Sequence, residues 1–393
     1  MRWASSLSVA DELAVAVREA ADALDCQLDG ARCDLVFAFV SREHRDGWHE
    51  LPGRLRERFP GALVLGSSAS GVIGDAVEVE QRAGLALAAV AMPGVERSSF
   101  HLPAERTPDP CDDPEAARAA WDQALGLDSG PDPHLILLAD PFTWAGPELL
   151  AGLDQAYPGG VKIGGLCSGG ARPGEHRLFC DRSAHHRGLV GVALRGPIEL
   201  EAVVAQGCTP IGAPMFVTRH QQQVVFELDG RPAIVVLREL FEQLPPRDLA
   251  RARNSLLLGV TVGPPREVYG PGDFLVRDLV GIDPNSGALA TATPLGKNAV
   301  VQFHLRDAET AAAELRELVA ARASGPRAAG ALLFSCLARG RGLYGEPGHD
   351  SALVRELLGP SLPIAGFFGN GEIGPIAGQT HVHGHTSAVL LAR

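Results

Sequence analysis

The sequence predicts an α/β fold with mixed β-sheets covered by helices, arranged as two related halves. Three observations carry this prediction. Helical stretches separate several apolar runs, and a helix between two strands implies that these strands are parallel. Other runs are joined by short turns with Gly or Pro, which implies antiparallel pairing. One order of elements also occurs three times, as strand, helix, strand, Gly-rich loop and hairpin.

The first copy begins at residues 34–40, an apolar run typical of a strand that is buried on both faces. A helix at 51–59, a strand at 62–65, a Gly-rich loop at 66–74 and a hairpin within 77–92 follow. The second copy has these elements at 134–139, 147–156, 161–163, 164–170 and 176–194. The third has them at 331–336, 351–358, 363–368, 366–375 and, for the last strand, 387–391.

The remaining segments set the predicted domain boundaries. Apolar residues from Leu13 to Leu24 recur every three or four positions, which predicts an amphipathic helix. After the second copy the pattern changes to short strands with helices at 233–244 and 307–321. We therefore expect an N-terminal helix within 1–30, a first domain at 31–225 and a second domain at 226–393.

Composition excludes several classes of partner. The formal net charge of −12 argues against binding nucleic acid or an anionic membrane through a basic face. No apolar run reaches the ~18 residues of a membrane span. The seven cysteines contain no C-x-x-C pair, so a disulfide framework or zinc ribbon is not expected. A reduced, cytoplasmic protein fits best.

The Gly-rich loops supply the candidate binding residues. Glycines after buried strands let main-chain N–H groups approach a ligand, and the carboxyl ends of strands are where α/β sheets place ligand contacts. Arg339 offers a planar fork for a carboxylate, and Glu372 could hold an amine or Arg339 itself. The candidates are Gly66, Ser67, Ser68, Ser70, Gly71, Gly165, Cys167, Ser168, Ser335, Cys336, Arg339, Asn370, Gly371 and Glu372.

Each chemical feature has a structural alternative. The glycines at 340–345 and 369–374 spell G-x-G-x-x-G, but neither run opens a helix, so a dinucleotide site is not expected. Arg339 could be an ion-pair partner that only ties loops together. Cys336 and Cys167 are either buried inert thiols, which we favour, or nucleophiles that need a neighbouring base.

Histidines raise the question of metal or haem. His381, His383 and His385 share one face of a predicted strand, as a zinc site requires, but no fourth ligand is evident. We therefore expect no metal. A haem iron could use one of these residues, or another histidine such as His185, His186 or His304, and nothing in the sequence selects one.

Several motifs resemble those of FIST-domain proteins. Residues 207–212, 216–219 and 228–233 resemble the junction signature of that family. Residues 333–340 (LFSCLARG) resemble its FSC-x-x-RG motif, and 366–375 resemble its G-F-x(3)-GEIGP motif. The loop at 66–71 is similar to the G-x-S-x-x-G loop of FIST N. The resemblance covers roughly residues 31–393.

The resemblance implies a sensory protein that binds a small ligand, an amino acid or related carboxylate, and signals to a separate protein. It implies no enzymatic activity. Some family members bind haem and sense nitric oxide, so a haem sensor is the first alternative. A cysteine- or metal-dependent enzyme is the second.

Overall fold

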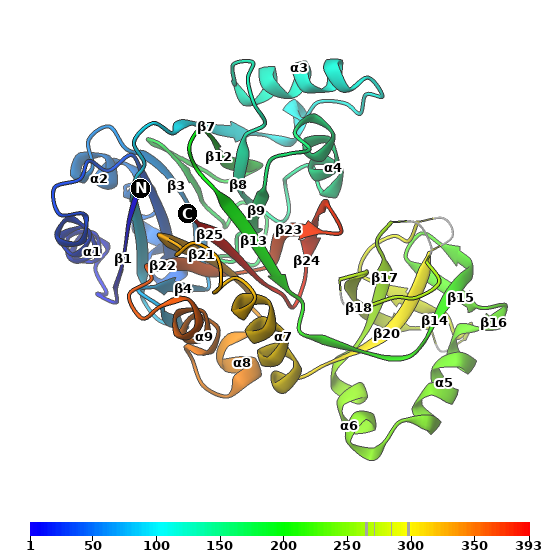
Figure 1. The fold of residues 1–393 in the computed structure, drawn as a ribbon. Helices are drawn as coiled ribbons and strands as arrows, with labels where there is room; N and C mark the ends of the chain where they lie inside the picture. The colour runs from blue at the N-terminus through cyan, green and yellow to red at the C-terminus, as the bar shows by residue number, and fades with distance from the viewer. Residues whose placement is uncertain (264–265, 271, 284, 297–298) are drawn as a thin grey trace. The chain divides into compact units, whose positions relative to one another are not determined.

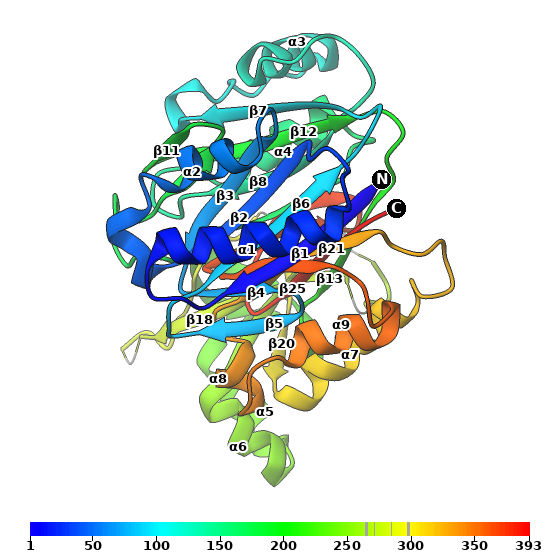
Figure 2. The same cartoon turned by 90° about the vertical axis from the view of Figure 1, so that its left-hand side faces the viewer.

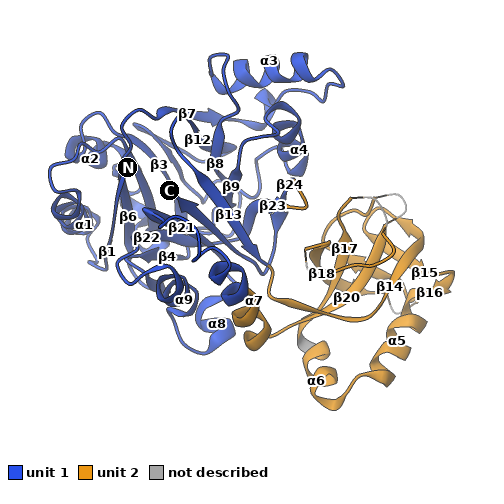
Figure 3. Cartoon of the chain, viewed as in Figure 1, with its two compact units in different colours: residues 1–205, 315–375, 379–393 blue, residues 206–314, 376–378 orange. Residues whose placement is uncertain are grey.

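A computed structural model describes residues 1–263, 266–270, 272–283, 285–296 and 299–393. The chain divides into two compact units, shown in Figure 3. Unit 1 comprises residues 1–205, 315–375 and 379–393, and unit 2 comprises residues 206–314 and 376–378. These units do not follow the predicted division at 225/226, which remains a prediction.

Unit 1, which is described throughout, contains three six-stranded sheets (Figures 1 and 2). The first has the order β1 (Arg2–Ser8), β6 (Leu85–Ala91), β2 (Leu35–Ser41), β3 (Leu63–Ala69), β10 (Leu178–Cys180) and β11 (Ser183–His185). The second has β7 (Glu96–Leu102), β12 (Leu189–Arg195), β8 (His134–Ala139), β9 (Lys162–Leu166), β23 (Gly371–Ile376) and β24 (Gln379–His383). The third has β13 (Leu200–Ala205), β25 (Ser387–Ala392), β21 (Gly330–Cys336), β22 (Ile364–Gly369), β4 (Gly71–Gly74) and β5 (Val77–Glu80).

The three sheets share one pattern of pairing. A central parallel pair, β2–β3, β8–β9 or β21–β22, is flanked by an antiparallel strand on one side. On the other side lies a hairpin whose first strand follows a different parallel pair along the chain. β4 pairs with β22, β10 with β3, and β23 with β9. The hairpins thus pass from sheet to sheet in a closed cycle. Superposition of the three copies remains a prediction.

Alternate residues of the central strands face two different cores, which explains their nearly continuous apolar sequences. Phe39, Phe334 and Phe367 point into a core shared by the three sheets, and the Phe39 and Phe367 rings stack at 5.1 Å between centroids. Residues of opposite parity, such as Val36 and Leu333, pack in the cores beneath the helices.

Helices cover the outer faces of the sheets. The first sheet packs on α1 (Leu13–Leu28) and α2 (Leu51–Arg58), and the second on α3 (Pro114–Leu125) and α4 (Pro147–Ala156). The third packs on α7 (Ala308–Ala320) and α9 (His349–Leu358), with the short α8 (Gly340–Tyr344) beside α9. Two 3-10 turns, η1 (Arg42–Gly47) and η2 (Ala104–Arg106), complete the unit.

Unit 2 contains a seven-stranded sheet in its described residues. Its order is β14 (Cys208–Gln221), β20 (Val300–Arg306), β17 (Leu256–Thr261), β18 (Phe274–Ile282), β19 (Leu289–Thr291), β15 (Val224–Leu228) and β16 (Arg231–Pro232). The helices α5 (Ala233–Gln243) and α6 (Pro246–Ser255) belong to the same unit. Leu237 of α5 shares a core with Leu258 and Phe303 of the sheet.

The mixed α/β fold class is confirmed, and several local predictions need correction. The N-terminal segment contains strand β1 before its helix. This strand was not predicted, because the serines in Arg2–Ser8 obscure its apolar pattern. The predicted Gly-rich loops are largely strand, since β3 continues through Ala69 and β22 through Gly369. Residues 340–344, which no predicted helix covered, form the short helix α8. Instead of two halves built alike, the structure has three similar sheets in one unit and a different sheet in the other.

Three glycines allow the parallel strands to pair closely. A Cβ added to Gly66, Gly164 or Gly366 would lie 2.0, 1.7 or 1.8 Å from the carbonyl oxygen of the residue opposite on the neighbouring strand. Backbone atoms form the obstacle, so the clash cannot be relieved by a side-chain rotation. Glycine is therefore required at the same place in each sheet.

We predict that Gly366→Ala lowers the free energy of unfolding by about 3 kcal/mol or more, because strands β21 and β22 must separate to admit the methyl group. Gly53→Ala is the matched control. Gly53 lies in α2 with no atom near its added Cβ, and alanine favours helix, so this change should leave stability equal or slightly higher. Urea unfolding measures the free energy of unfolding of both variants. Equal stabilities would contradict the requirement for glycine at position 366.

Candidate functional site

The predicted Gly-rich segments do meet in unit 1. Ser168 and Asn370 follow the second parallel strands of their sheets, and their amides donate to neighbouring segments. Ser168 N–H bonds to the carbonyl of Ser68 at 3.4 Å, and Asn370 N–H bonds to the carbonyl of Leu166 at 3.0 Å. Segments far apart in sequence are thus joined by main-chain contacts.

The Ser168 hydroxyl bonds to both of the other Gly-rich segments. It accepts from the amide of Ser70 at 2.9 Å and donates to the carbonyl of Phe368. The Ser70 hydroxyl donates in turn to the carbonyl of Ser168. Together with the two amide contacts, these bonds tie the segment at 164–170 to the other two segments. The pairing of Val72 with Phe367 joins those two to each other, and we call the three joined segments the loop ring.

Most polar groups of the loop ring have partners within the protein. The Ser68 hydroxyl accepts from the amide of Arg177 at 2.9 Å, and the Asn370 side chain donates to the carbonyl of Cys167 at 2.7 Å. Ser67, Ser68 and Ser168 are buried, whereas Asn370 is exposed. The structure therefore brings these predicted residues together in an arrangement that closes on itself. Ligand binding by them remains a prediction.

Arg339 is a buried side chain that follows strand β21. Its Nε lies 2.6 Å from one carboxylate oxygen of Asp350, and its Nη2 lies 3.1 Å from the other. Arg339 is 0% exposed, and the Asp350 side chain is 2% exposed. The fork that was predicted to hold a ligand carboxylate holds a carboxylate of the protein.

Two hydroxyl groups also hydrogen-bond to this ion pair. The hydroxyl of Tyr344 lies 2.6 Å from Arg339 Nη2, and that of Ser335 lies 3.3 Å from Asp350 Oδ2. Burial alone would raise the pKa of Asp350, but the Arg339 guanidinium holds it well below its usual range. Glu372 is buried as well and accepts from the amide of Thr386 at 3.3 Å.

The structure also shows where the candidate nucleophiles and metal ligands lie. Cys167 is fully buried, and burial together with nearby Asp140 raises the pKa of its thiol well above the usual range. Cys336 is buried at 7% exposure. His383 Nε2 lies 2.9 Å from the Gly374 carbonyl oxygen. Within the part of the chain that the structure describes, no three His, Cys, Asp or Glu side chains group as metal ligands do.

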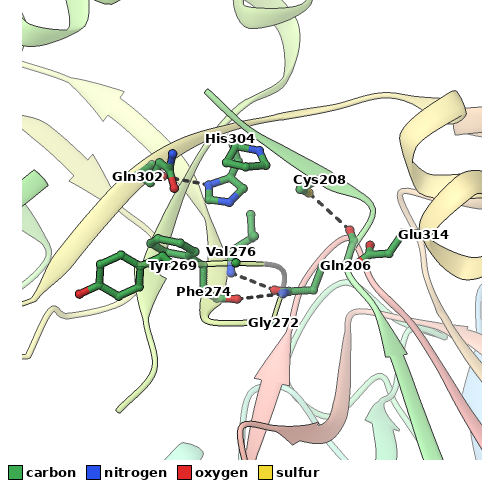
Figure 4. A pocket seen from close by; sticks show the side chains of 11 residues that line it. Gln206, Cys208, Tyr269, Gly272, Phe274, Val276, Gln302, His304 and Glu314 are labelled. Atoms are coloured by element: carbon green, nitrogen blue, oxygen red, sulfur yellow. Dashed lines mark hydrogen bonds between the residues drawn. The ribbon is translucent and has the colours of Figure 1, made fainter. Parts of the chain in front are cut away.

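A cavity that the sequence did not reveal lies in unit 2 (Figure 4). Its volume is about 160 Å³. It is lined by Gln206, Cys208, Pro210, Tyr269, Gly270, Gly272, Phe274, Val276, Gln302, His304 and Glu314. These residues come from β14, β18, β20, α7 and the segments beside them.

Two backbone contacts fix the amide of Gln206 at one side of the cavity. Its Nε2 donates to the carbonyl of Phe274 at 2.8 Å, and its Oε1 accepts from the amide of Val276 at 3.1 Å. The side chain of Gln206 thus hydrogen-bonds to backbone groups of β18, in addition to the bonds that β18 makes with its neighbouring strands. The wall that carries Phe274 and Val276 is held in a defined position.

His304 presents a lone pair to the cavity. Its Nδ1 lies 2.9 Å from the carbonyl oxygen of Gln302. A carbonyl only accepts, so Nδ1 carries the proton and Nε2 is the acceptor. Burial lowers the pKa of His304, which keeps the imidazole neutral near pH 7. The ring packs edge-on against Phe274 at 5.3 Å between centroids.

Part of this cavity could have been inferred from the sequence. Gln302 and His304 are two residues apart on a strand, so their side chains share one face of β20. Gly259 lies on the neighbouring strand, where an added Cβ would be 2.4 Å from the His304 ring. A polar pair opposite a strand glycine is a signal for such a cavity.

We predict that Arg339→Ala lowers the free energy of unfolding by about 3–5 kcal/mol, because it leaves the Asp350 carboxylate buried without its counter-charge. The double variant Arg339→Met, Asp350→Leu should recover much of this loss. Arg316→Ala removes an exposed ion pair with Glu356 and serves as control, with a much smaller effect. Urea unfolding measures all three, and equal losses for Arg339→Ala and Arg316→Ala would refute a structural role.

The Asp350 carboxylate also predicts a pH dependence. Its folded-state pKa lies below the unfolded value, so its stabilising contribution is complete above the usual range of an aspartate and is lost as pH falls. Wild type should lose stability between about pH 5 and pH 3 more steeply than Asp350→Asn, which has no carboxyl group to protonate at this position. If the stabilities of the two proteins fell in parallel as pH decreases, the lowered pKa of Asp350 in the folded protein would be contradicted.

Comparisons with known proteins cover the whole chain. The FIST N domain model matches residues 34–231, and the FIST C domain model matches residues 233–375. An uncharacterized protein of Mycobacterium tuberculosis is 36% identical over 395 residues, which are 100% of this chain and 99% of that protein. Human F-box only protein 22 is 34% identical over 104 residues, 26% of this chain and 24% of its own length.

A cyanuric acid hydrolase from A. caulinodans aligns over 100% of this chain and 99% of its own, with 10% identity and a TM-score of 0.32, which is too low for an argument. The match to both domain models is decisive because together they span most of the sequence. The chain belongs to the FIST family and contains its FIST N and FIST C domains.

Proposed function

We propose that this protein is a cytosolic sensory protein that binds a small ligand in the cavity of unit 2. FIST domains are sensory domains implicated in small-ligand binding and signalling. The observation that carries the proposal is the lone pair of His304, a neutral imidazole nitrogen that lines a walled cavity. Concave sites with a few placed polar groups are where small ligands bind.

The volume of the cavity limits the ligand. At about 160 Å³ it is similar to an engineered cavity of about 150 Å³ that holds benzene. Drug-sized ligands occupy pockets of about 300–1,000 Å³. The ligand that fits is therefore a small metabolite of roughly six to ten non-hydrogen atoms.

Haem does not fit the described surroundings of His304, because a porphyrin is far larger than benzene. Another of the histidines considered for haem, His185, stacks on His101 at 3.7 Å between ring centroids. Burial, followed by the neighbouring histidines, lowers the pKa of His185 to about 4. A visible absorption spectrum of the purified protein distinguishes a haem sensor from the small-ligand sensor proposed here.

For the loop ring we propose a structural role. Most of its hydroxyl and amide groups bond to other groups of the protein, and Arg339 binds Asp350, so the predicted carboxylate partner is already supplied by the protein. The buried thiols Cys167 and Cys336 offer little support for a cysteine-dependent enzyme.

The signal would pass to a separate protein. FIST domains act in signalling, and this chain is matched by FIST N and FIST C over most of its length. No disulfide joins the seven cysteines, all of which lie in the described residues, and this favours a reducing compartment such as the cytosol. Among the described helices, none has the length and apolar character that a membrane crossing requires.

We predict that protein purified from its own host retains a small ligand and that Val276→Phe loses it, because the larger side chain fills the cavity. Leu275→Phe is the matched control, since Leu275 is its neighbour on β18 and faces the opposite side. Native mass spectrometry detects the ligand, and a cooperative thermal transition confirms folding. Retention by both variants would refute the site. So would a wild type that neither retains a ligand nor gains one in a metabolite screen.

A further inference from the structure

We propose that unit 1 contains a second ligand site, which takes an organic cation with a large apolar body. The site is a cavity of about 450 Å³, lined mainly by α3, α4 and the segment at 104–111 (Figure 1). It shares no residue with the cavity of unit 2. The inference therefore goes beyond the proposed function and does not depend on it.

A glycine and small side chains leave this cavity open beside a large ring. Glu148, Ala151, Gly152 and Gln155 recur every three or four positions on α4 and share the face that lines the cavity. Trp121 of α3 packs against that face, where a Cβ added to Gly152 would lie 2.8 Å from the indole ring. Since Gly152 has no side chain and Ala151 has only a methyl group, space remains beside the indole.

The segment at 104–111 forms a constrained wall of the cavity. It continues from β7, which pairs with β12 along its whole length. Near its other end, Gln155 Nε2 of α4 donates to the carbonyl of Cys111 at 2.6 Å. Two prolines between these attachments, Pro108 and Pro110, fix their own φ angles and restrict the backbone. The cavity is therefore preformed, and a preformed site loses little conformational entropy when a ligand binds.

The volume and the lining determine the body of the ligand. Pockets for drug-sized ligands have volumes of about 300–1,000 Å³, and this cavity, at about 450 Å³, is within that range. It is about three times as large as a cavity that holds benzene. The most buried lining residues are Ala117, Trp121 and Leu149, which are 4%, 3% and 1% exposed. An apolar body of about two to four fused rings would fill this space and bury its surface against these side chains.

The charged side chains of the lining are both acids. Asp109 of the segment and Glu148 of α4 are exposed, so they lie where the cavity meets solvent. The described residues that line the cavity include no lysine, arginine or histidine. Asp112 and Asp113, which are also exposed, extend the negative charge along the chain from Asp109. A cationic group at the mouth is therefore attracted, and an anionic group is repelled.

Three fluorescent probes of nearly equal shape test the charge of the ligand. Pyrenemethylamine, pyrenemethanol and pyrenecarboxylate share one apolar body and differ in charge. Fluorescence anisotropy at pH 7 should show the amine binding at least about tenfold more tightly than the other two. The double variant Asp109→Asn, Glu148→Gln should lose this preference and still bind the alcohol. Asp46→Asn, Glu57→Gln is the control, because it removes two exposed acids that do not line the cavity.

Three further variants test the location of the site. Ala151→Phe should weaken the binding of pyrenemethylamine at least about tenfold, because the phenyl ring occupies the cavity. Ala119→Phe, an exposed change on α3 outside the lining, should bind the probe as wild type does. Val276→Phe, which fills the cavity of unit 2, should also leave this binding unchanged. A cooperative thermal transition confirms that each variant is folded.

The outcomes separate this proposal from the proposed function. If the three probes bind equally well, or the carboxylate binds best, the assignment of a cation is wrong. If folded Ala151→Phe binds pyrenemethylamine as tightly as wild type, or no probe binds, the site itself is wrong. Loss of binding in Val276→Phe would place the probe in unit 2 and would also overturn this site. Retention of a ligand by host-purified protein is a separate measurement, so the function proposed above can stand when this site fails.

Discussion

The closed exchange of hairpins is the constraint on which unit 1 depends. Each central parallel pair leaves one edge with unpaired N–H and C=O groups, and burying such an edge unpaired is costly. The edge of β22 is completed by β4, that of β3 by β10 and that of β9 by β23. Every sheet therefore needs a strand from another copy, and none of the three is complete by itself.

Other contacts strengthen the same exchange. Glu78 lies on β5, within the hairpin that joins the third sheet, and its carboxylate accepts from the amides of Gly348 and Ser351, both at 2.9 Å. These amides are at the start of α9, where an acceptor is needed and a negative charge is favoured. The FIST N domain thus supplies the cap of a FIST C helix, and the loop ring fastens the copies at their turns.

The bounds of helices and strands could be predicted from the sequence where the local residue pattern determines the structure. The strand at 134–139 and the helix at 147–156 have the predicted bounds, because their apolar patterns end at turn residues. The candidate residues of the loop ring were expected together, and they are together. The environment of Arg339 was not foreseeable, since its partner Asp350 appears in sequence as an ordinary acid near a helix start.

The cavity of unit 2 was missed for a related reason. Its lining combines Gln206 and Glu314, more than 100 residues apart, with side chains of three strands. No single window of sequence contains enough of these residues to show a pattern. Only the strand pairing brings the imidazole of His304 close to Phe274 and Tyr269.

The hairpin exchange also has a consequence for synthesis on the ribosome. Gly74 ends β4, and its partner β22 begins at Ile364, about 290 residues later. At about 5–20 residues per second, the ribosome needs roughly 15–60 s to supply that partner. During this time the β4–β5 hairpin has no sheet to join, and its strand edge is open to other nascent chains. A chaperone that shields this segment would therefore raise the yield of native protein, more so when translation is slow.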